Sequence, residues 1–392
     1  MHGIRDTLID VTRLVGRSIL GRLPTGIDRV GLAYIDHFRH RARALVRWRG
    51  LGLELSDAAS DRLFARLLCP QERLTKGTRA LVRRGAMANL SQRPVPGRLL
   101  INTGHSGLEG PGYATILHQR QVRLVFLLHD LVPISHPEYC RKGEDERHRS
   151  RLDNMLALAA GIITNSEATL TELQHHTRNR TRPLPPTTAA PLAPGLPIIM
   201  PGPRPLEAPY FVILGTIEPR KNHWLLLHIW RHIVADLADA APRLVIIGQR
   251  GWECENVEDM LERCGPLRGV VFEHPNCSDA QLITYLHHAQ ALLFPSFAEG
   301  YGMPLIEALS LGVPVLASDL PVFEEIAGSV PEYIDPLDGR CWRELIEAYT
   351  PADSVPRAAQ LTRIKAFRMP DWATHFAKVD ALLESLRGAP PS

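Results

Sequence analysis

The second half of the chain alternates short apolar runs with apolar residues at helical spacing. Short apolar runs predict buried strands, and apolar positions three and four residues apart predict amphipathic helices between them. The runs predict strands at residues 211–215, 243–248, 270–273, 291–295 and 314–318. The helical patterns predict a helix capped by Asn222, a helix near 257–264, a helix from the Ser278–Gln281 capping box to near Ala289, and a helix at 304–311. Strands that alternate with helices predict a parallel, doubly wound sheet.

The first half shows the same alternation less clearly. Its patterns predict strands at 8–14, 43–48, 99–102, 123–128 and 161–165, with helices at 27–38 and from Glu167 onward. Between the two halves, ten prolines lie within the 27 residues of 183–209. Proline fixes φ and removes a backbone donor, so this stretch predicts an extended linker without helix or central strand. We therefore expect an α/β protein with two Rossmann-like domains that face each other across a cleft.

The net charge of +3 hides an asymmetry between the two halves. Residues 1–200 contain 29 Lys and Arg against 17 Asp and Glu, and the remaining residues contain 16 against 25. A basic first half suits an anionic partner, such as a phosphate-linked acceptor or an anionic membrane surface. A solvated arginine-rich surface is the alternative. A nucleic-acid partner is not expected.

Two further features bear on where the protein works. No apolar run approaches the ~20 residues of a membrane-spanning helix, and charged residues interrupt the first 13 positions where a signal peptide needs an apolar stretch. We therefore expect a cytoplasmic protein, with peripheral contact to the inner face of the cell membrane as an option. The six cysteines are far apart and form no C-x-x-C pair, which favours buried reduced thiols over disulfides or a zinc site.

Candidate chemistry follows two of the predicted strands in the second half. After strand 291–295, Glu299 and Glu307 flank a glycine-rich turn that runs into a helix. Free amides at a helix start bind phosphate, and Glu307 on that helix can accept from a ribose diol. After strand 211–215, the loop GTIEPRKN carries Arg220 and Lys221, whose charges can stabilise a diphosphate leaving group. The alternative is that these charges are ordinary surface features. Both loops lie at the same edge of one sheet, which favours a shared site.

These motifs resemble the retaining GT-B glycosyltransferases of family 4, in a subgroup with EPRKN-type loops and bacterial surface-polysaccharide members. The Glu299–Glu307 element and the EPRKN loop carry the resemblance, together with TGIDRV at 25–30, His129-Asp130, Asn165-Ser166 and Asp371-Trp372. The resemblance implies an N-terminal acceptor-binding domain at 1–195, a nucleotide-sugar-binding domain at 196–370 and a helix at 371–388 that crosses back. Many members have Arg after the strand glycine, where this chain has Thr216, so Arg220 is expected to take over that role.

The resemblance also implies roles for individual residues. Catalytic contacts are expected from His129, Arg220, Lys221 and Glu299. Donor contacts are expected from Gly26, Gly215, Gly300, Tyr301, Gly302, Met303, Pro304, Leu305 and Glu307. Acceptor contacts are expected from Thr25, Arg29 and Asp130. The sequence contains no D-x-D triplet, so a metal-chelated donor is not expected. No cofactor is expected, since the nucleotide sugar is a co-substrate.

The expected activity is retaining transfer of a hexose from a nucleotide-diphosphate sugar to a carbohydrate or lipid-linked acceptor, as in lipopolysaccharide assembly. A guanosine diphosphate donor with a mannose- or rhamnose-type sugar is the first candidate. A non-catalytic nucleotide-sugar-binding or scaffold protein on the same fold remains the alternative. G-x-G-x-x-G is missing from the first strand–helix turns of both halves, which disfavours a dinucleotide-dependent oxidoreductase. The absence of G-x-x-x-x-G-K excludes a P-loop kinase.

Overall fold

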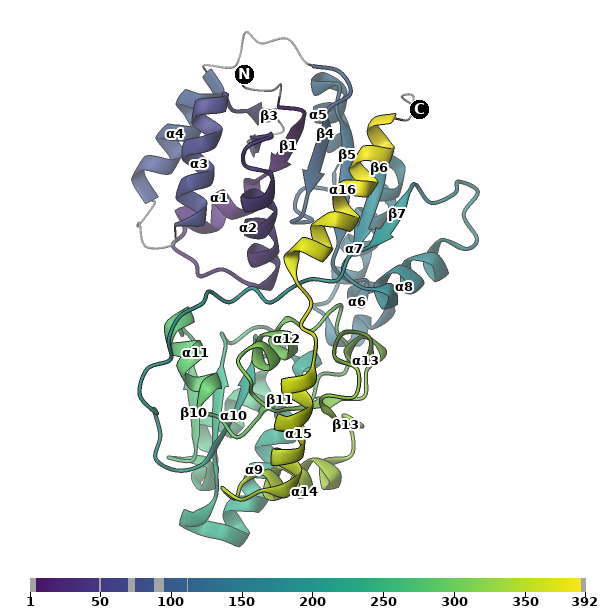
Figure 1. Cartoon of the computed structure of the whole chain (residues 1–392). Coiled ribbons are helices and arrows are strands. Elements are labelled where there is room, and N and C mark those ends of the chain that lie inside the picture. Colours follow the sequence, from purple (N-terminus) through teal and green to yellow (C-terminus); the bar gives the residue numbers. More distant parts are fainter. Residues whose placement is uncertain (1–4, 49–50, 70–74, 88–94, 111, 389–392) are drawn as a thin grey trace. The chain divides into compact units, whose positions relative to one another are not determined.

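The computed structural model describes residues 5–48, 51–69, 75–87, 95–110 and 112–388 (Figure 1). The chain divides into two compact units. Unit 1 consists of Met1–Leu131, Glu146–Gly195 and Asp371–Ser392. Unit 2 consists of Val132–Asp145 and Leu196–Pro370. The segment Val132–Asp145 therefore lies with unit 2, although the residues on both sides of it belong to unit 1.

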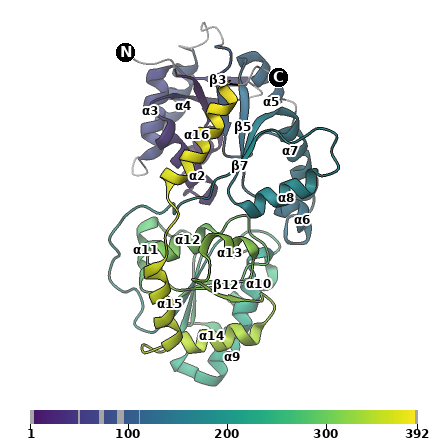
Figure 2. The ribbon, with the colours of Figure 1, turned by 45° about the vertical axis from the view of Figure 1, so that its right-hand side comes forward.

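Unit 1 is built on a seven-stranded sheet in the order β3-β2-β1-β4-β5-β6-β7. Its strands are β1 (Thr7–Asp10), β2 (Ala42–Trp48), β3 (Leu51–Glu54), β4 (Leu99–Asn102), β5 (Arg123–Leu128), β6 (Ala159–Thr164) and β7 (Thr187–Ala189). All neighbouring pairs are parallel except β2 and β3. Its helices are α1 (Thr12–Ile19), α2 (Gly26–Phe38), α3 (Asp57–Leu68), α4 (Thr75–Met87), α5 (Gly112–Arg120), α7 (Glu144–Leu158), α8 (Glu167–Thr177) and α16 (Trp372–Gly388). Figure 2 shows α16 lying across this sheet, where it contacts β6 and β7.

Unit 2 is built on a six-stranded parallel sheet in the order β10-β9-β8-β11-β12-β13. Its strands are β8 (Tyr210–Leu214), β9 (Arg243–Ile247), β10 (Val271–His274), β11 (Leu292–Phe294), β12 (Val315–Ser318) and β13 (Glu332–Ile334). Its α-helices are α6 (Val132–Ser135), α9 (His223–Leu237), α10 (Glu255–Arg263), α11 (Asp279–His287), α12 (Met303–Ser310), α13 (Pro321–Ala327), α14 (Gly339–Tyr349) and α15 (Val355–Ala366). Short 3-10 turns lie at Pro137–Tyr139, Pro219–Lys221, Ala238–Ala240 and Gly265–Leu267.

The strand order of unit 2 reverses between β8 and β11. From β8 the chain moves outward through β9 to β10, and it then returns to β11 on the other side of β8. The loops that leave β8 and β11 therefore run in opposite directions, and the carboxyl edge between two such strands is where open α/β sheets generally have a ligand-binding crevice. In unit 1 the same reversal falls between β1 and β4.

Most predicted strands match the structure, because an unbroken apolar run buried on both faces leaves little choice of element. The predicted strand at 8–14 is wrong beyond Asp10. There the Asp10 carboxylate accepts from the backbone N–H of Thr12 at 3.0 Å, and α1 begins at Thr12. The proline-rich segment was expected to form neither helix nor central strand, and it contributes only β7 at the sheet edge, where Thr187–Ala189 contains no proline.

Two smaller expectations also need correction. Asn222 precedes α9 but does not cap it through its side chain. It has a left-handed backbone with φ 55°, and its amide donates to the Pro336 carbonyl at 2.9 Å. All six cysteines are free, but only Cys254 is buried and Cys69 is exposed. Within the described ranges, no helix combines the length and apolar character that crossing a membrane requires.

Candidate functional site

The loop after β8 is fixed by two glycines that approach each other closely. Gly215 has φ 147° and Gly248, at the end of β9, has φ 158°. A Cβ atom on Gly248 would lie only 1.9 Å from the Gly215 carbonyl oxygen, so this position has no room for a side chain. The loop then forms the short 3-10 turn Pro219–Lys221. This turn brings Arg220 and Lys221 to the carboxyl edge of the sheet.

Glu299, in the loop after β11, joins both cations. Its carboxylate lies 2.7 Å from Nη1 of Arg220 and 2.5 Å from Nζ of Lys221. Two hydrogen bonds to backbone carbonyls strengthen the link. The Phe297 N–H donates to the Arg220 carbonyl at 2.9 Å, and Nη1 of Arg220 donates to the Ala298 carbonyl at 2.9 Å. The structure therefore brings together three residues that the sequence predicts on two separate loops, at the carboxyl edge between β8 and β11.

The three charged side chains differ in burial and in their ionisation. The side chains of Lys221 and Glu299 are each at most 9% exposed, and that of Arg220 is 21% exposed. Burial raises the pKa of Glu299, but the nearby charges of Arg220 and Lys221 outweigh it and lower the pKa to about 2. Burial lowers the pKa of Lys221, and the Glu299 carboxylate partly offsets this effect.

A fourth charged residue, Glu218, balances the cluster. Its carboxylate accepts from Nε and Nη2 of Arg220 at 3.1 and 2.7 Å. Two cations are thus compensated by two carboxylates, so this group of four is neutral as it stands. Sequence reasoning missed Glu218, although it lies within the same EPRKN loop. The signal available was its position two residues before Arg220.

The glycine-rich turn leads into α12 as predicted. Gly302 has φ 114°, and an added Cβ would meet the Phe323 ring at 2.8 Å. Glu307 lies on α12 and is 4% exposed, which makes it a buried carboxylate rather than a solvated one. Of the amides expected to bind phosphate, Leu305 N–H already donates to Gly302 at 3.0 Å, and Pro304 has no N–H. The candidate amides are therefore those of Gly302 and Met303.

In unit 1, the predicted residues near Thr25 are organised by Asp28. The Asp28 carboxylate is 2% exposed and accepts from the Thr25 backbone N–H at 2.7 Å. It also pairs with Arg13 at 2.8 Å and with Arg17 at 2.7 Å. Gly26 is the first residue of α2, and Arg29 donates to the Gly195 carbonyl at 3.2 Å. Asp28 and its two arginines were not predicted as site residues.

His129 follows β5 and is 6% exposed. Its Nε2 lies 2.8 Å from the Thr103 carbonyl, an oxygen that can only accept, so Nε2 carries a proton. Its ring lies 4.9 Å from that of His105, which bonds to the Leu127 carbonyl at 2.7 Å. Burial lowers the pKa of both histidines. His129 is therefore a neutral imidazole held by the Thr103 carbonyl. The backbone carbonyl of the next residue, Asp130, accepts from His148 at 3.2 Å.

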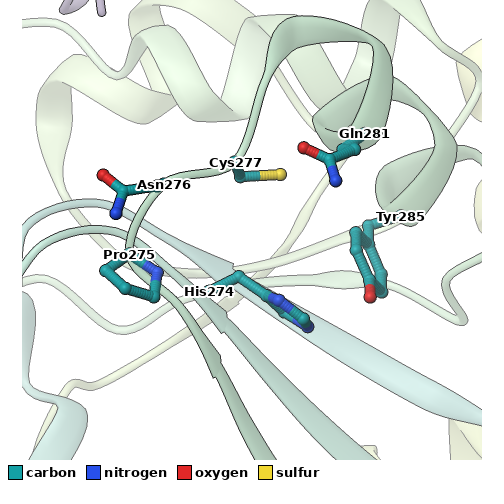
Figure 3. Close-up of a pocket in the computed structure, with 6 residues that line it drawn as sticks. All are labelled: His274, Pro275, Asn276, Cys277, Gln281 and Tyr285. Carbon is teal, nitrogen blue, oxygen red and sulfur yellow. The ribbon is translucent and has the colours of Figure 1, made fainter. Parts of the chain in front are cut away.

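A pocket of about 250 Å³ opens at the end of β10. It is lined by His274, Pro275, Asn276, Cys277, Gln281 and Tyr285 (Figure 3). Figure 3 shows His274 pointing toward Tyr285 of α11, and their ring centroids are 4.8 Å apart. β10 lies two strands from β8, a separation of roughly 10 Å at the usual strand spacing. Among the residues with a described position, no group of three or more His, Cys, Asp or Glu could hold a metal ion.

Comparison with known proteins gives the class first. The model of the family described as glycosyl transferases group 1 matches residues 199–330. This stretch contains the β8 loop, the β10 pocket, Glu299 and Glu307. The match supports an enzyme of the glycosyltransferase class.

Particular relatives point the same way. The chain is 28% identical over 220 residues to the serotype-specific mannosyltransferase WbdA of Escherichia coli, covering 52% of this chain and 26% of that protein. It is 34% identical over 129 residues to the Escherichia coli O-antigen chain mannosyltransferase B, covering 33% of each chain. The match therefore spans only about a quarter to a third of the length of these relatives.

Solved structures confirm the fold predicted from the sequence, a GT-B architecture of two Rossmann-like parallel-sheet domains. The Anabaena protein Alr3699/HepE, crystallised with UDP and glucose, has a TM-score of 0.68 at 16% identity and covers 97% of this chain and 99% of its own. Sucrose-phosphate synthase from Thermosynechococcus elongatus has a TM-score of 0.58 at 17% identity, covering 82% and 81%. At these identities the similarity concerns the fold alone.

Proposed function

We propose that the protein is a retaining hexosyltransferase that moves a sugar from a nucleotide-diphosphate donor to a carbohydrate or lipid-linked oligosaccharide. The observation that carries the proposal is the buried cluster of Arg220, Lys221 and Glu299 at the carboxyl edge between β8 and β11. This cluster lies inside the region that matches the glycosyl transferases group 1 family. Fixed cations at a strand-end crevice are suited to stabilise a diphosphate as it leaves the sugar.

Mannose is the sugar that the relatives favour, because WbdA and mannosyltransferase B are both named mannosyltransferases. A rhamnose-type sugar is the other candidate from the sequence. The base is open between guanine, the first candidate for a mannose-type donor, and uracil, since the similar Anabaena protein was crystallised with UDP.

In the proposed donor position, Arg220 and Lys221 contact the diphosphate together with the amides of Gly302 and Met303. Glu307 accepts from the ribose, and the base occupies the pocket beside His274 and Tyr285. That pocket lies two strands from the β8 loop, which suits a ligand with its phosphates at one end and its base at the other. Glu299 and His129 contact hydroxyls of the transferred sugar.

The proposed reaction needs no carboxylate base. The bond from the anomeric carbon to the diphosphate oxygen breaks, and a bond from that carbon to the acceptor hydroxyl oxygen forms on the same face. The acceptor proton passes to an oxygen of the departing diphosphate. Arg220 and Lys221 stabilise the negative charge that develops there. No metal or cofactor takes part in this scheme.

The basic first half is proposed to face an anionic partner, either a phosphate-linked acceptor or an anionic membrane surface. A cytoplasmic location with peripheral membrane contact fits this charge and the O-antigen role in the relative's name. Surface binding of this kind is electrostatic, so it should weaken as salt is raised.

A thermal-shift panel of GDP, UDP, ADP and CDP tests the proposal. One diphosphate should raise the unfolding temperature as its concentration exceeds its Kd, because a ligand that binds only the folded state stabilises it. The corresponding nucleotide sugar should then be consumed with acceptor or slowly hydrolysed. Binding without any turnover would favour the alternative, a non-catalytic nucleotide-sugar-binding protein. No stabilisation by any of the four would refute both.

A further inference from the structure

The segment Val132–Asp145 leaves unit 1 three residues after His129 and packs with unit 2. It contains α6, the 3-10 turn Pro137–Tyr139 and the start of α7. We call this segment the strap. Two of its side chains make ring contacts with loops at the carboxyl edge of the unit 2 sheet, and these contacts are not part of the donor site described above.

The first contact reaches the loop after β11. The Tyr139 and Phe297 rings stack almost parallel, with centroids 4.9 Å apart and planes inclined by 6°. Phe297 is two residues before Glu299, and its N–H donates to the Arg220 carbonyl at 2.9 Å. A movement of the Phe297 backbone would therefore displace both Arg220 and Glu299, the two residues of the ion pair.

The second contact reaches the loop after β9. The Arg141 guanidinium lies 4.7 Å from the centroid of the Trp252 ring. The indole Nε1 of Trp252 is buried and has no hydrogen-bond partner among the described residues, so packing and the Arg141 contact hold the ring. The preceding residue, Gly251, donates to the Ile217 carbonyl at 3.0 Å, which ties Trp252 to the β8 loop.

The strand order shows how these two contacts are related to the β8 loop. Because β8 lies between β9 and β11, the strap contacts the loops on both sides of the loop that carries Arg220 and Lys221. Both flanking loops are also hydrogen-bonded to that central loop. A stacked aromatic pair and a cation–π contact each contribute enough to bias a loop between positions.

We propose that Tyr139 and Arg141 are positioning residues, which hold the loops after β9 and β11 so that Arg220 and Lys221 meet the donor diphosphate. This inference rests on the proposed function. An effect on diphosphate binding separates this role from simple adhesion of the strap to unit 2.

The test is isothermal titration of the full chain with GDP and UDP, well below the unfolding temperature. For whichever diphosphate binds wild type, Tyr139→Ala should raise the Kd on the order of 3- to 10-fold. Tyr139→Phe keeps the stacked ring and should stay near wild type. Arg141→Ala should also weaken binding. The control Arg340→Ala removes an arginine whose side chain is 88% exposed on α14, and it should change nothing.

Each outcome is decisive. Weaker diphosphate binding in Tyr139→Ala, with wild-type affinity in Tyr139→Phe, supports the inference. If Tyr139→Ala does not fold, weaker binding in Arg141→Ala supports it instead. Wild-type affinity in both Tyr139→Ala and Arg141→Ala overturns the inference and leaves the proposed function intact. Equal loss in Tyr139→Phe overturns it too, since the hydroxyl would then be responsible. If wild type binds neither diphosphate, the proposed function fails, and the inference fails with it.

Discussion

Glu299→Gln should destabilise the folded protein and strengthen its response to a nucleoside diphosphate. The substitution removes one charge from a buried group in which Arg220 and Lys221 are balanced by Glu218 and Glu299. The remaining three residues would carry a net charge of one positive unit. Lys221, whose side chain is 9% exposed, would lose its carboxylate partner. A buried cation without its partner is costly, and an anionic ligand would relieve that cost.

The size of the effect follows from the ionisation of Glu299. Its pKa falls from 4.5 to about 2 on folding, which corresponds to about 3 kcal/mol of stability at neutral pH. Because the folded pKa is the lower one, this stability is complete above pH ~4.5 and is lost as the pH falls through about 2. Breaking a buried pair costs a similar amount, about 3–5 kcal/mol. For a chain of 392 residues, this loss lowers the unfolding temperature by roughly 4–6 °C.

Differential scanning calorimetry at pH 7, with and without the diphosphate that binds wild type, measures both effects. The control Glu344→Gln breaks an exposed pair between Arg340 and Glu344 and should shift unfolding by less than about 0.5 kcal/mol. If Glu299→Gln unfolds at the wild-type temperature, the pair is not buried and stabilising as described. If the ligand stabilises the variant less than it stabilises wild type, the charge argument is refuted.

Three further predictions concern chemistry, pH and backbone. Lys221→Ala and Glu307→Ala should each lower the rate of sugar transfer about 100-fold or more in a product assay. EDTA should leave the wild-type rate unchanged, and strong inhibition by EDTA would count against the mechanism. Burial lowers the pKa of His375 to about 4, so the free energy of unfolding should fall by about 3 kcal/mol as the pH falls from 7 to 4. His375→Gln should flatten that part of the pH profile of stability. Gly248→Ala should lower the free energy of unfolding by about 3 kcal/mol, because the new Cβ meets a backbone carbonyl. The control Gly16→Ala has open space in α1 and should stabilise the protein slightly, so equal unfolding temperatures of the two variants would disprove the clash.

The sheet of each unit could be predicted because its central strands are short unbroken apolar runs. The run at 123–128 matches β5 at both ends, since five of its six residues are buried. The pattern at 8–14 was ambiguous, because its apolar residues fit both the two-residue period of a strand and the 3.6-residue period of a helix. The strand ends there because Asp10 turns its carboxylate to Arg47, Thr12 and Tyr113, and such partners are visible only in three dimensions.

The site could be predicted as a set of loops but not as a balance of charges. The sequence placed Arg220 and Lys221 on the loop of one strand and Glu299 on that of another, and parallel strand ends share one edge. It did not reveal that Glu218 and Glu299 neutralise both cations, because side-chain pairing depends on how the loops fold back. The strap was missed for the same reason, since Phe297 and Trp252 are distant from it in sequence.

Isothermal titration of wild type and Lys221→Ala with a nucleoside diphosphate and with the matching nucleoside tests the central claim most directly. We predict that wild type binds the diphosphate at least about tenfold more tightly than the nucleoside, because charge-assisted contacts to phosphate contribute about 1.5–3 kcal/mol. Lys221→Ala should lose most of that preference and keep its affinity for the nucleoside. An unchanged preference in Lys221→Ala would mean that the cluster at the carboxyl edge between β8 and β11 does not hold the diphosphate.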